Sequence, residues 1–490
     1  MQFLKKTKSI CPECHEVLDA TICEEDGKVL IKKECATHGP YEDVYWSSFD
    51  DYSRVQKYAI IGDGVDNPAT EVEKGHPFDC GLCPKHKSHT SLAIIDVTNR
   101  CNLRCPICFA NAATTGYVYE PTKKQIHDML ENLREIKPIP ATALQFSGGE
   151  PTIREDLPEL IRMAKELEFD HVEVNSNGIK LAESAEYCKE LKDAGVSSIY
   201  LQFDGLTSKP SVTARGLDLV QTKLRAVENC HKAGFDSLVL VPTVVKGVND
   251  DQLGDIIRFA AKNFDVVRCV NFQPISITGR VDYDKRKEMR ITIPDCMKLI
   301  EEQTDGQIQT SDFYPVPFVV PIARAVGALK GRRYLEFTAH EHCGMATFIL
   351  LKDDELVPIT HYIDVEKFME AMNGVYEDAS KGSKTKARIG MLRALRYAKF
   401  DLIRELAGPV LKEGTYEALG KLMRKMILIS MMHFMDAYNF DLERVERCCI
   451  HYAVPDGRLI PFCTMNTLHR PQVEEKFSVP IWEWKESRKN

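Results

Sequence analysis

The chain has 490 residues, of which 28% are charged and 44% hydrophobic, and its formal net charge is −8. This length allows one large domain together with smaller ones. Because 72 acidic residues outnumber 64 basic ones, a nucleic-acid binder held by phosphate contacts is disfavoured. The opening MQFLKKTKSICPEC lacks the apolar core of a signal peptide, and no run of about 18 apolar residues predicts a membrane span. We therefore expect a cytoplasmic protein.

The seventeen cysteines predict metal chemistry, because disulfide scaffolds are mostly short secreted chains. Thirteen of them are clustered along the chain. The other four, Cys188, Cys230, Cys269 and Cys296, stand alone and are interpreted as small buried apolar residues.

Residues 1–50 predict a small β module that holds one metal ion. The runs LDATIC and KVLIKK flank EEDG, which indicates a hairpin. The spacing C-x2-C-x20-C-x2-H brings Cys11 and Cys14 beside Cys35 and His38, with Cys23 as a rival to His38 for the fourth place. The pattern resembles a zinc ribbon or rubredoxin knuckle, in which Zn or Fe would add folding energy to a very small core.

Residues 51–90 connect this module to the next part of the chain and carry a second knuckle, Cys80-x2-Cys83. Two thiolates are too few for a tetrahedral site. The remaining ligands are therefore expected from other segments.

Apolar strands alternate with amphipathic helices over residues 91–285 and predict an α/β fold with a parallel sheet. The expected strands are 91–98, 142–149, 171–178, 198–205, 237–245 and 266–275, and the expected helices are 122–136, 154–169, 184–195, 219–235 and 251–264. Six such units favour a partial TIM-type barrel, (β/α)6, over an open doubly wound sheet. Ligand sites are expected where the strands end.

Residues 286–490 are expected to form a mainly helical C-terminal region that holds the substrate and the auxiliary clusters. Residues 373–390 are interpreted as an exposed loop. Residues 416–440 are interpreted as an apolar helix, which serves either as core or as a wall of a channel for a long flexible chain. The methionines of that segment are Met423, Met426, Met431, Met432 and Met435.

The last cysteine cluster surrounds a Pro-Asp-Gly turn, which places Cys448 or Cys449 opposite Cys463 across a hairpin. Together with Cys80, Cys83 and Cys343, these residues form a pool of thiols for one or two auxiliary [4Fe–4S] clusters. The spacing does not divide the pool between clusters.

The segment CNLRCPICF places Cys101, Cys105 and Cys108 in the loop after the first strand of the barrel. Three thiolates can hold a [4Fe–4S] cluster and leave one iron open at the mouth of the sheet. The next strand ends in SGGEP, where Gly148 and Gly149 let the backbone approach a ligand and Glu150 can accept from an ammonium group. An amino acid that chelates the open iron would meet these residues.

The cysteine triplet and the GGEP motif together resemble the radical S-adenosylmethionine superfamily over at least residues 91–280. The resemblance implies that the cluster passes an electron to S-adenosylmethionine, whose cleavage yields a 5′-deoxyadenosyl radical that abstracts a substrate hydrogen. The residue before the third cysteine is often aromatic in this superfamily, and here it is Ile107. By position, Asn175, Ser176, Gln202 and Asp204 are expected to face the ribose or the substrate, and Val244 the adenine.

The chain as a whole resembles an archaeal group that includes tetraether lipid synthases and has also been described as pterin methyltransferases of methanopterin biosynthesis. The resemblance is carried by the N-terminal module and by CGLCPKHKSHT, CNLRCPICFANA, FQPISITGR, DFYPVPF and PDGRLIPFC. It implies a rubredoxin-like iron and auxiliary clusters.

The preferred expectation is an enzyme that removes hydrogen from unactivated carbons of two phytanyl chains and joins the chain ends. Each chain loses one hydrogen, so two molecules of S-adenosylmethionine are consumed per bond. The alternative is a methyltransferase that acts on a pterin. A non-catalytic metal-ribbon adaptor is a third reading, but it leaves the cysteine triplet beside GGEP unexplained. The expected partners are the archaeal lipid or the pterin and an electron donor such as ferredoxin or flavodoxin, and a lipid substrate adds peripheral contact with a membrane.

Overall fold

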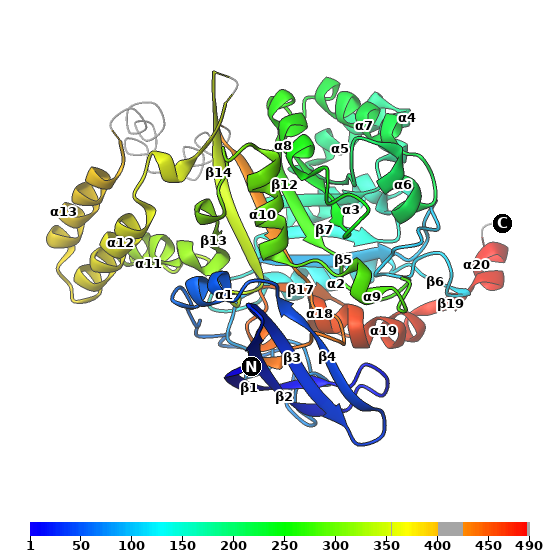
Figure 1. Cartoon of the computed structure of the whole chain (residues 1–490). Helices are drawn as coiled ribbons and strands as arrows, with labels where there is room; N and C mark the ends of the chain where they lie inside the picture. Colours follow the sequence, from blue (N-terminus) through cyan, green and yellow to red (C-terminus); the bar gives the residue numbers. More distant parts are fainter. Residues whose placement is uncertain (354, 400–424, 488–490) are drawn as a thin grey trace.

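The structure is a computed structural model that describes residues 1–353, 355–399 and 425–487 (Figure 1). Its N-terminal part is an antiparallel sheet of β1 (Gln2–Ile10), β2 (Val17–Glu25), β3 (Lys28–Cys35) and β4 (Gly39–Trp46). The predicted hairpin is formed by β2 and β3, and Gly27 provides the positive φ of 74° that its turn requires. Helix α1 (Phe49–Gln56) follows, with the Ser48 side chain accepting the N–H of Asp51 as its N-cap.

The predicted α/β partial barrel is confirmed. Its six expected strands are β5 (Leu92–Thr98), β7 (Ala143–Gly148), β8 (His171–Ser176), β9 (Ser198–Gln202), β10 (Leu238–Val241) and β12 (Val267–Pro274), and they pair in parallel in that order. The helices of this part are α2 (Lys123–Arg134), α3 (Leu157–Glu166), α4 (Ile179–Glu183), α5 (Ala185–Ala194), α6 (Ser208–Arg215), α7 (Val220–Lys232) and α8 (Leu253–Lys262). Short strands β6 (Tyr117–Tyr119) and β11 (Thr243–Val244) lie at its edge.

The C-terminal region adds two parallel strands to this sheet, one at each side. Strand β16 (Ile427–Met432) pairs with β12, and β17 (Ile450–Ala453) pairs with β5. Antiparallel neighbours then extend the sheet: β14 (Gly344–Lys352) with β13 (Tyr314–Pro315) and β15 (Glu355–Pro358) on one side, and β18 (Leu459–Pro461) on the other. The two ends of the sheet do not pair in the part of the chain that the structure describes, so the barrel is open.

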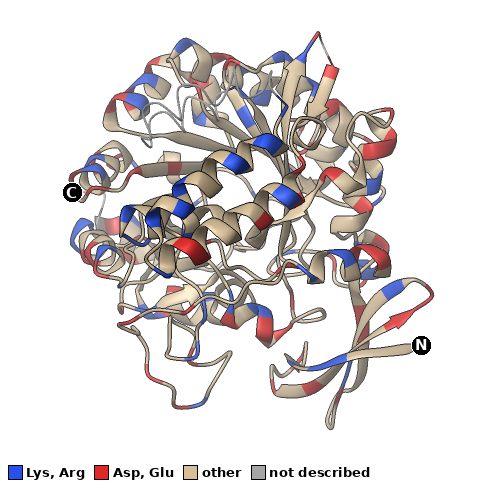
Figure 2. Cartoon of the chain, turned by 90° about the vertical axis from the view of Figure 1, so that its left-hand side faces the viewer, with Lys and Arg blue, Asp and Glu red and all other residues tan. Residues whose placement is uncertain are grey.

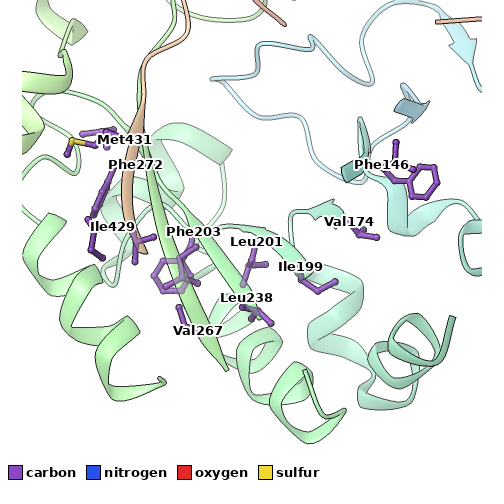
Figure 3. Packing of buried hydrophobic residues seen from close by; sticks show 14 of the residues in the cluster. Phe146, Val174, Ile199, Leu201, Phe203, Leu238, Val267, Phe272, Ile429 and Met431 are labelled. Atoms are coloured by element: carbon purple, nitrogen blue, oxygen red, sulfur yellow. The ribbon is translucent and has the colours of Figure 1, made fainter. Parts of the chain in front are cut away.

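Alternation along the strands separates an apolar outer face from a cavity inside. Along most of β8, β9, β12 and β16, buried hydrophobic residues of the large core cluster alternate with less buried residues. Figure 3 shows this layer, which includes Phe146, Val174, Ile199, Leu201, Phe203, Leu238, Val267, Phe272, Ile429 and Met431. The intervening side chains point the other way, because neighbouring residues of a strand face opposite sides of the sheet.

The prediction of an apolar helix over 416–440 is wrong for the described part of that segment. Residues 427–432 form β16, which pairs on both sides with β12 and β14. Its burial alternates, with Ile427, Ile429 and Met431 in the core and the residues between them only half buried. Hydrophobic periodicity alone does not distinguish a short buried strand from a buried helix. Here the backbone hydrogen bonds to two neighbouring strands favour the strand. Residues 416–424, with Met423, lie outside the described residues.

A helical side region consists of α11 (Val320–Lys330), α12 (Val365–Ser380) and α13 (Lys384–Ala394) around a small core of their own. The prediction of an exposed loop over 373–390 is wrong, because α12 and α13 occupy most of it and only a short turn separates them. Helix α13 contains no acidic residue, and Figure 2 shows Lys and Arg spread over the helices of this face.

The other helices are short and connect these parts: α9 (Arg286–Met289), α10 (Ile293–Gln303), α17 (Leu442–Glu446), α18 (Phe462–Thr464), α19 (Arg470–Lys476) and α20 (Ile481–Ser487), which follows the edge strand β19 (Ser478–Pro480). Among the described residues, no helix combines the length and the apolar character that a membrane span requires.

Hydrogen bonds attach the N-terminal sheet to the C-terminal region, and Ile22, Val29 and Trp46 of this sheet join the large hydrophobic core. Ser9 donates to the carbonyl oxygen of Phe440 at 2.5 Å, and Tyr45 donates to Oδ2 of Asp441 at 2.9 Å. These contacts place β1 and β4 beside the segment that leads into α17.

Candidate functional site

The predicted cluster loop follows β5, and its three cysteines line one cavity. Leu103 donates its N–H to Sγ of Cys101 at 3.4 Å, and the backbone of Cys108 exchanges two hydrogen bonds of 2.9 Å with Arg280. Burial raises the pKa of the Cys101 thiol to about 12 and also raises that of Cys105, so free thiols would stay protonated here. Their ionisation therefore requires a positive partner such as iron.

The geometry of the triplet suits a cluster better than a single ion. The three sulfur atoms do not all lie within 4.8 Å of one another, unlike the donor atoms of the compact groups in the described residues. In a [4Fe–4S] cluster each cysteine binds a different iron, so wider spacing is required. These residues fit the group that the motif predicts.

Gly148 and Gly149 serve the contact between β7 and the cluster loop. A Cβ on Gly148 would lie 2.1 Å from the carbonyl oxygen of Thr98, and one on Gly149 would lie 2.1 Å from that of Arg100. The N–H of Gly149 donates to Thr98 at 2.7 Å and that of Glu150 to Arg100 at 2.9 Å. The two glycines thus hold the GGE segment against the residues that precede Cys101.

Glu150 is only 1% exposed, and its carboxylate is mostly committed to the protein. One oxygen accepts from the N–H and hydroxyl of Thr152 and from Ser176, and the other accepts from the N–H of Asn177 at 2.7 Å. Burial raises the pKa of Glu150 despite these donors. The side chain caps the 3-10 turn η1 (Pro151–Ile153) and also lies in the cavity wall. An ammonium ligand would have to use the remaining lone pair of the second oxygen.

The strand-end residues chosen by position divide into two groups. Asn175, Ser176 and Gln202 lie in the cavity wall, whereas Asp204 and Val244 do not. Asp204 instead pairs with Arg215, with 2.7 Å between Oδ1 and Nη2. Val244 is fully buried in the hydrophobic core. The roles expected for these residues in binding S-adenosylmethionine stay predictions.

Arg215 brings a positive charge to the thiols. It lies in the cavity wall, donates to the carbonyl oxygen of Ile107 at 3.0 Å, and its pKa is raised by Asp204 and by the thiols of Cys105 and Cys108 although burial acts in the opposite direction. Lys223, which donates to Gln202 at 2.7 Å, is buried beside it. Burial lowers the pKa of Lys223 to about 8.

The cavity has a volume of about 820 Å³ and two walls of different character. The polar wall comes from β7, β8, β9 and β12 and includes Gln145, His171, Glu173, Asn175, Tyr200, Gln202, Asn271 and Gln273. The apolar wall comes from β5, β14, β16, β17 and nearby loops and includes Leu92, Ile94, Phe348, Leu428, Met432, Phe434, Tyr452 and Phe462. A flat molecule with a polar edge and an apolar face matches this arrangement.

The polar wall holds a carboxylate. Nε2 of His171 lies 2.9 Å from one oxygen of Glu173, and Nε2 of Gln145 donates to the other at 3.0 Å. Farther along the wall, the hydroxyl of Tyr200 accepts from Asn271 at 2.5 Å and from Gln273 at 2.9 Å. The network fixes these side chains before any ligand arrives.

The N-terminal module brings Cys11, Cys14, Cys35 and His38 together, with all four donor atoms within 4.8 Å of one another. Nδ1 of His38 lies 3.6 Å from Sγ of Cys11 and 3.5 Å from Sγ of Cys35, and the sulfurs of Cys14 and Cys35 are 3.9 Å apart. Tetrahedral zinc with bonds of about 2.3 Å to sulfur and 2.0 Å to nitrogen requires ligand atoms about 3.5 to 3.8 Å apart. The geometry therefore fits one metal ion, and Cys23 lies outside the group.

Four thiols of the predicted auxiliary pool lie near one another in the C-terminal region. Cys343 precedes β14, Cys448 and Cys449 precede β17, and Cys463 lies in α18 after the β17–β18 hairpin. Burial raises the pKa of Cys463 to about 12 and that of Cys449 to about 11, and the charge of Cys343 adds to both shifts. A buried thiolate needs a positive partner, and thiolates are the ligands that iron–sulfur clusters prefer, so this group fits such a cluster.

The second knuckle has a histidine partner. The two ring nitrogens of His76 lie 3.2 Å from Sγ of Cys80 and 3.2 Å from Sγ of Cys83. Cys80 belongs to the same hydrophobic cluster as Cys448 and Cys463, which places the knuckle near the other thiols.

Sequence reasoning did not identify Arg215, Glu173 or His76. His76 stands four residues before Cys80 and was detectable as a metal-ligand type beside a knuckle. Glu173 occupies an inward position two residues before Asn175, so strand alternation was a usable signal. No sequence signal indicates Arg215, because its position depends on how α6 folds back over the cluster loop.

Two parts of the chain match protein-family models. Residues 95–260 match the Radical SAM superfamily, and residues 3–47 match the HMPTM N-terminal zinc ribbon domain. The first match contains the cysteine triplet and the GGE segment, and the second contains the four metal-binding candidates of the N-terminal module.

The chain is 53% identical to a 7,8-dihydro-6-hydroxymethylpterin dimethyltransferase of Methanocaldococcus jannaschii, over 99% of this chain and 98% of that protein. It is also 25% identical to a GTP 3′,8-cyclase of Clostridium acetobutylicum over 42% of this chain and 63% of that one. Among solved structures, SuiB of Streptococcus suis bound to its precursor peptide has a TM-score of 0.37 at 18% identity, over 45% of this chain and 46% of that one.

The preferred expectation of a lipid-joining enzyme is contradicted by the full-length relative, whose name instead matches the pterin alternative. The polar wall that carries Glu173 is also a poor lining for two phytanyl chains, because a buried carboxylate is costly beside hydrocarbon. The error arose because the motifs that carry the resemblance surround the cofactors and do not describe the substrate.

Proposed function

Because the chain belongs to the family of the Methanocaldococcus jannaschii 7,8-dihydro-6-hydroxymethylpterin dimethyltransferase, we propose that this radical S-adenosylmethionine enzyme methylates a dihydropterin. The observation that supports this most directly is a cavity in which the cysteine triplet and the polar wall around Glu173 line one space.

The polar wall suits the pyrimidine side of a pterin. That ring presents an amide-type N–H beside an amino group, and both are hydrogen-bond donors. A carboxylate can accept from two neighbouring donors at once. In this proposal Glu173, held by His171 and Gln145, accepts from them, while Tyr452 and Phe462 of the apolar wall contact the ring face.

The cofactors would be held at the mouth of the same cavity. Cys101, Cys105 and Cys108 would ligate the [4Fe–4S] cluster, which together with bound S-adenosylmethionine supplies the means to remove a hydrogen atom from an unactivated carbon. Gly148, Gly149 and Glu150 would keep the cluster loop in place. Asn175, Ser176 and Gln202 would contact S-adenosylmethionine.

Arg215 would attract the carboxylate of S-adenosylmethionine. Asp204 fixes the guanidinium with two hydrogen bonds of 2.8 and 2.7 Å, so the charge is oriented before the cofactor binds. Asp204 thus acts through Arg215 and not by direct contact.

The chain would divide by task into four parts. Residues 1–50 form the metal module, 51–90 the connection with the Cys80 knuckle, 91–285 the radical S-adenosylmethionine barrel and 286–490 the region of substrate and auxiliary clusters. The last part also completes the barrel sheet through β16 and β17. An electron donor such as ferredoxin or flavodoxin would supply the reducing electron.

The test is an anaerobic assay of the reconstituted enzyme with 7,8-dihydro-6-hydroxymethylpterin, S-adenosylmethionine and a strong reductant. Mass spectrometry should find a pterin that has gained one or two methyl groups, and S-adenosylmethionine labelled in its methyl group identifies the donor. Cleavage of S-adenosylmethionine to 5′-deoxyadenosine with an unchanged pterin would refute the proposed substrate. Cys105→Ala is the control and should abolish both reactions.

A further inference from the structure

A buried arginine lies among the auxiliary thiols. Arg444 belongs to α17 and is 3% exposed. Its Nε donates to Sγ of Cys343 at 3.3 Å, and its Nη2 donates to the carbonyl oxygen of His433 at 2.8 Å. The ring of Tyr45 lies on another side, 5.6 Å from the guanidinium carbon.

This guanidinium differs from the other buried arginines in lacking an acidic partner. Arg154, Arg290, Arg447 and Arg470 each pair with a carboxylate, at 2.6, 2.7, 2.9 and 2.6 Å. No carboxylate in the described residues lies within 4.0 Å of the Arg444 guanidinium. A buried charge is costly unless something balances it.

Asp441 and Glu443, which lie close to Arg444 in the sequence, are already committed to other partners. Asp441 accepts from Thr7 at 2.6 Å and from Tyr45 at 2.9 Å, and Lys5 lies 3.6 Å from its carboxylate. Glu443 pairs with Lys5 at 2.7 Å. Neither is available to Arg444, although both lie within three residues of it.

Thiols are the groups around Arg444 that can take a negative charge. Cys343 is in direct contact with it through the Nε–Sγ hydrogen bond, and Sγ of Cys463 accepts from the N–H of Met435, two residues after the His433 carbonyl that Arg444 binds. A neutral thiol would leave the guanidinium unbalanced. Thiolates that hold an iron–sulfur cluster carry the charge that is missing, because the thiolates outweigh the positive core.

We propose that Arg444 is the fixed counter-cation of an auxiliary iron–sulfur cluster held by Cys343, Cys463 and Cys448 or Cys449, and that it raises the reduction potential of this cluster. Reduction adds one electron and makes the cluster more negative, so a fixed positive charge favours the reduced form. Hydrogen bonds to cluster sulfurs act in the same direction, and the Nε–Sγ contact supplies one.

The test is a redox titration followed by electron paramagnetic resonance on the full-length protein. Cys101, Cys105 and Cys108 are replaced by alanine so that the loop cluster contributes no signal. Cys343→Ser identifies the signal of this auxiliary cluster by removing it. The assay contains no pterin, so its outcome is independent of the proposed methyl transfer.

Arg444→Gln should lower the midpoint potential, and Arg444→Lys, which keeps the charge, should shift it less. An unchanged potential in Arg444→Gln with full iron content would overturn the proposal. If Arg444→Gln loses the iron of this cluster while Arg444→Lys retains it, the cluster needs the positive charge, which supports the proposal. If both variants lose the iron, Arg444 serves folding alone and the proposal is overturned. Lys5→Met is the matched control, because its charge is already balanced by Asp441 and Glu443.

Discussion

Glu173 occupies an inward position of β8, and its neighbours His171 and Gln145 hold its two oxygens in the cavity wall. Glu173→Gln keeps the size of the side chain but replaces one acceptor by a donor and removes the charge. We expect kcat/KM for the pterin to fall about 10- to 100-fold, which corresponds to about 1.5 to 3 kcal/mol for hydrogen bonds to a charged group. The measurement is steady-state methylation under anaerobic conditions.

The rate of S-adenosylmethionine cleavage without pterin should stay close to that of the parent in Glu173→Gln, because the cluster loop is untouched. Glu166→Gln, on the exposed face of α3, is the control and should change neither reaction. An equal loss of both reactions in Glu173→Gln would show that this residue supports the fold and not pterin binding.

The buried Lys223 should make the stability of the folded protein depend on pH. Burial lowers its pKa in the folded protein to about 8, below the ~10.4 of an unfolded lysine. Between these values the unfolded chain binds more protons, so the contribution of Lys223 to stability increases as the pH rises through this window, by about 3 kcal/mol at most. Below pH 8 the folded protein carries the full cost of the buried charge.

The measurement is the thermal unfolding midpoint of the parent and of Lys223→Met at pH 8 and pH 10. We expect the advantage of the parent over Lys223→Met to be larger at pH 10, where the lysine is neutral and still donates to Gln202. Lys124→Met removes an exposed lysine and should show no such change. An advantage that shrinks at pH 10 would mean that Lys223 is stabilised in its charged form.

At the scale of elements, the contact between the GGE segment and the cluster loop is the tightest in the site. Gly149→Ala would place a Cβ 2.1 Å from the carbonyl oxygen of Arg100, so one of the two backbones must move. We expect a loss of about 3 kcal/mol in stability and a lower iron content of the reconstituted protein. Thermal unfolding and iron analysis measure the two effects.

Gly374→Ala is the matched control for that variant. Gly374 lies within α12, and no atom lies within 4 Å of its added Cβ. Alanine should stabilise the helix there by about 1 kcal/mol. Normal iron content in Gly149→Ala would show that the two segments are not coupled.

The helices and strands also show how much of the fold the sequence could predict. Strands β5 to β12 alternate with amphipathic helices, and this regular pattern was sufficient to place all six. The run ILISMM of β16 instead predicts a helix, because five of its six residues are apolar and its partners β12 and β14 are distant in the sequence. The cysteine triplet and GGE segment are local motifs, whereas the pairing of Arg215 with Asp204 and of Arg444 with Cys343 exists only after the chain has folded.

For the whole molecule, the N-terminal module connects one candidate metal site to another. Ser9 lies in β1, two residues before Cys11, and Lys33 lies in β3, two residues before Cys35. These two side chains donate to the carbonyl oxygens of Phe440 and Ala437 at 2.5 and 2.6 Å, just before the helix that carries Arg444. A metal that holds the ends of β1 and β3 together therefore also fixes the segment leading to α17.

His38→Ala removes one of the four donors that lie within 4.8 Å, and it should lower the metal content by one ion per chain. Because the hydrophobic cluster around the metal ligands is very small, the loss of the metal should loosen this end of the module and expose residues 437–446. Hydrogen exchange of that segment, compared between His38→Ala and the parent, measures the effect.

Cys23→Ala is the control, since Cys23 is buried in β2 away from the donors and should leave the metal content unchanged. If Cys23→Ala loses the ion and His38→Ala retains it, the fourth ligand is Cys23 and not His38. Unchanged exchange over 437–446 after loss of the ion would show that the module is stable without its metal.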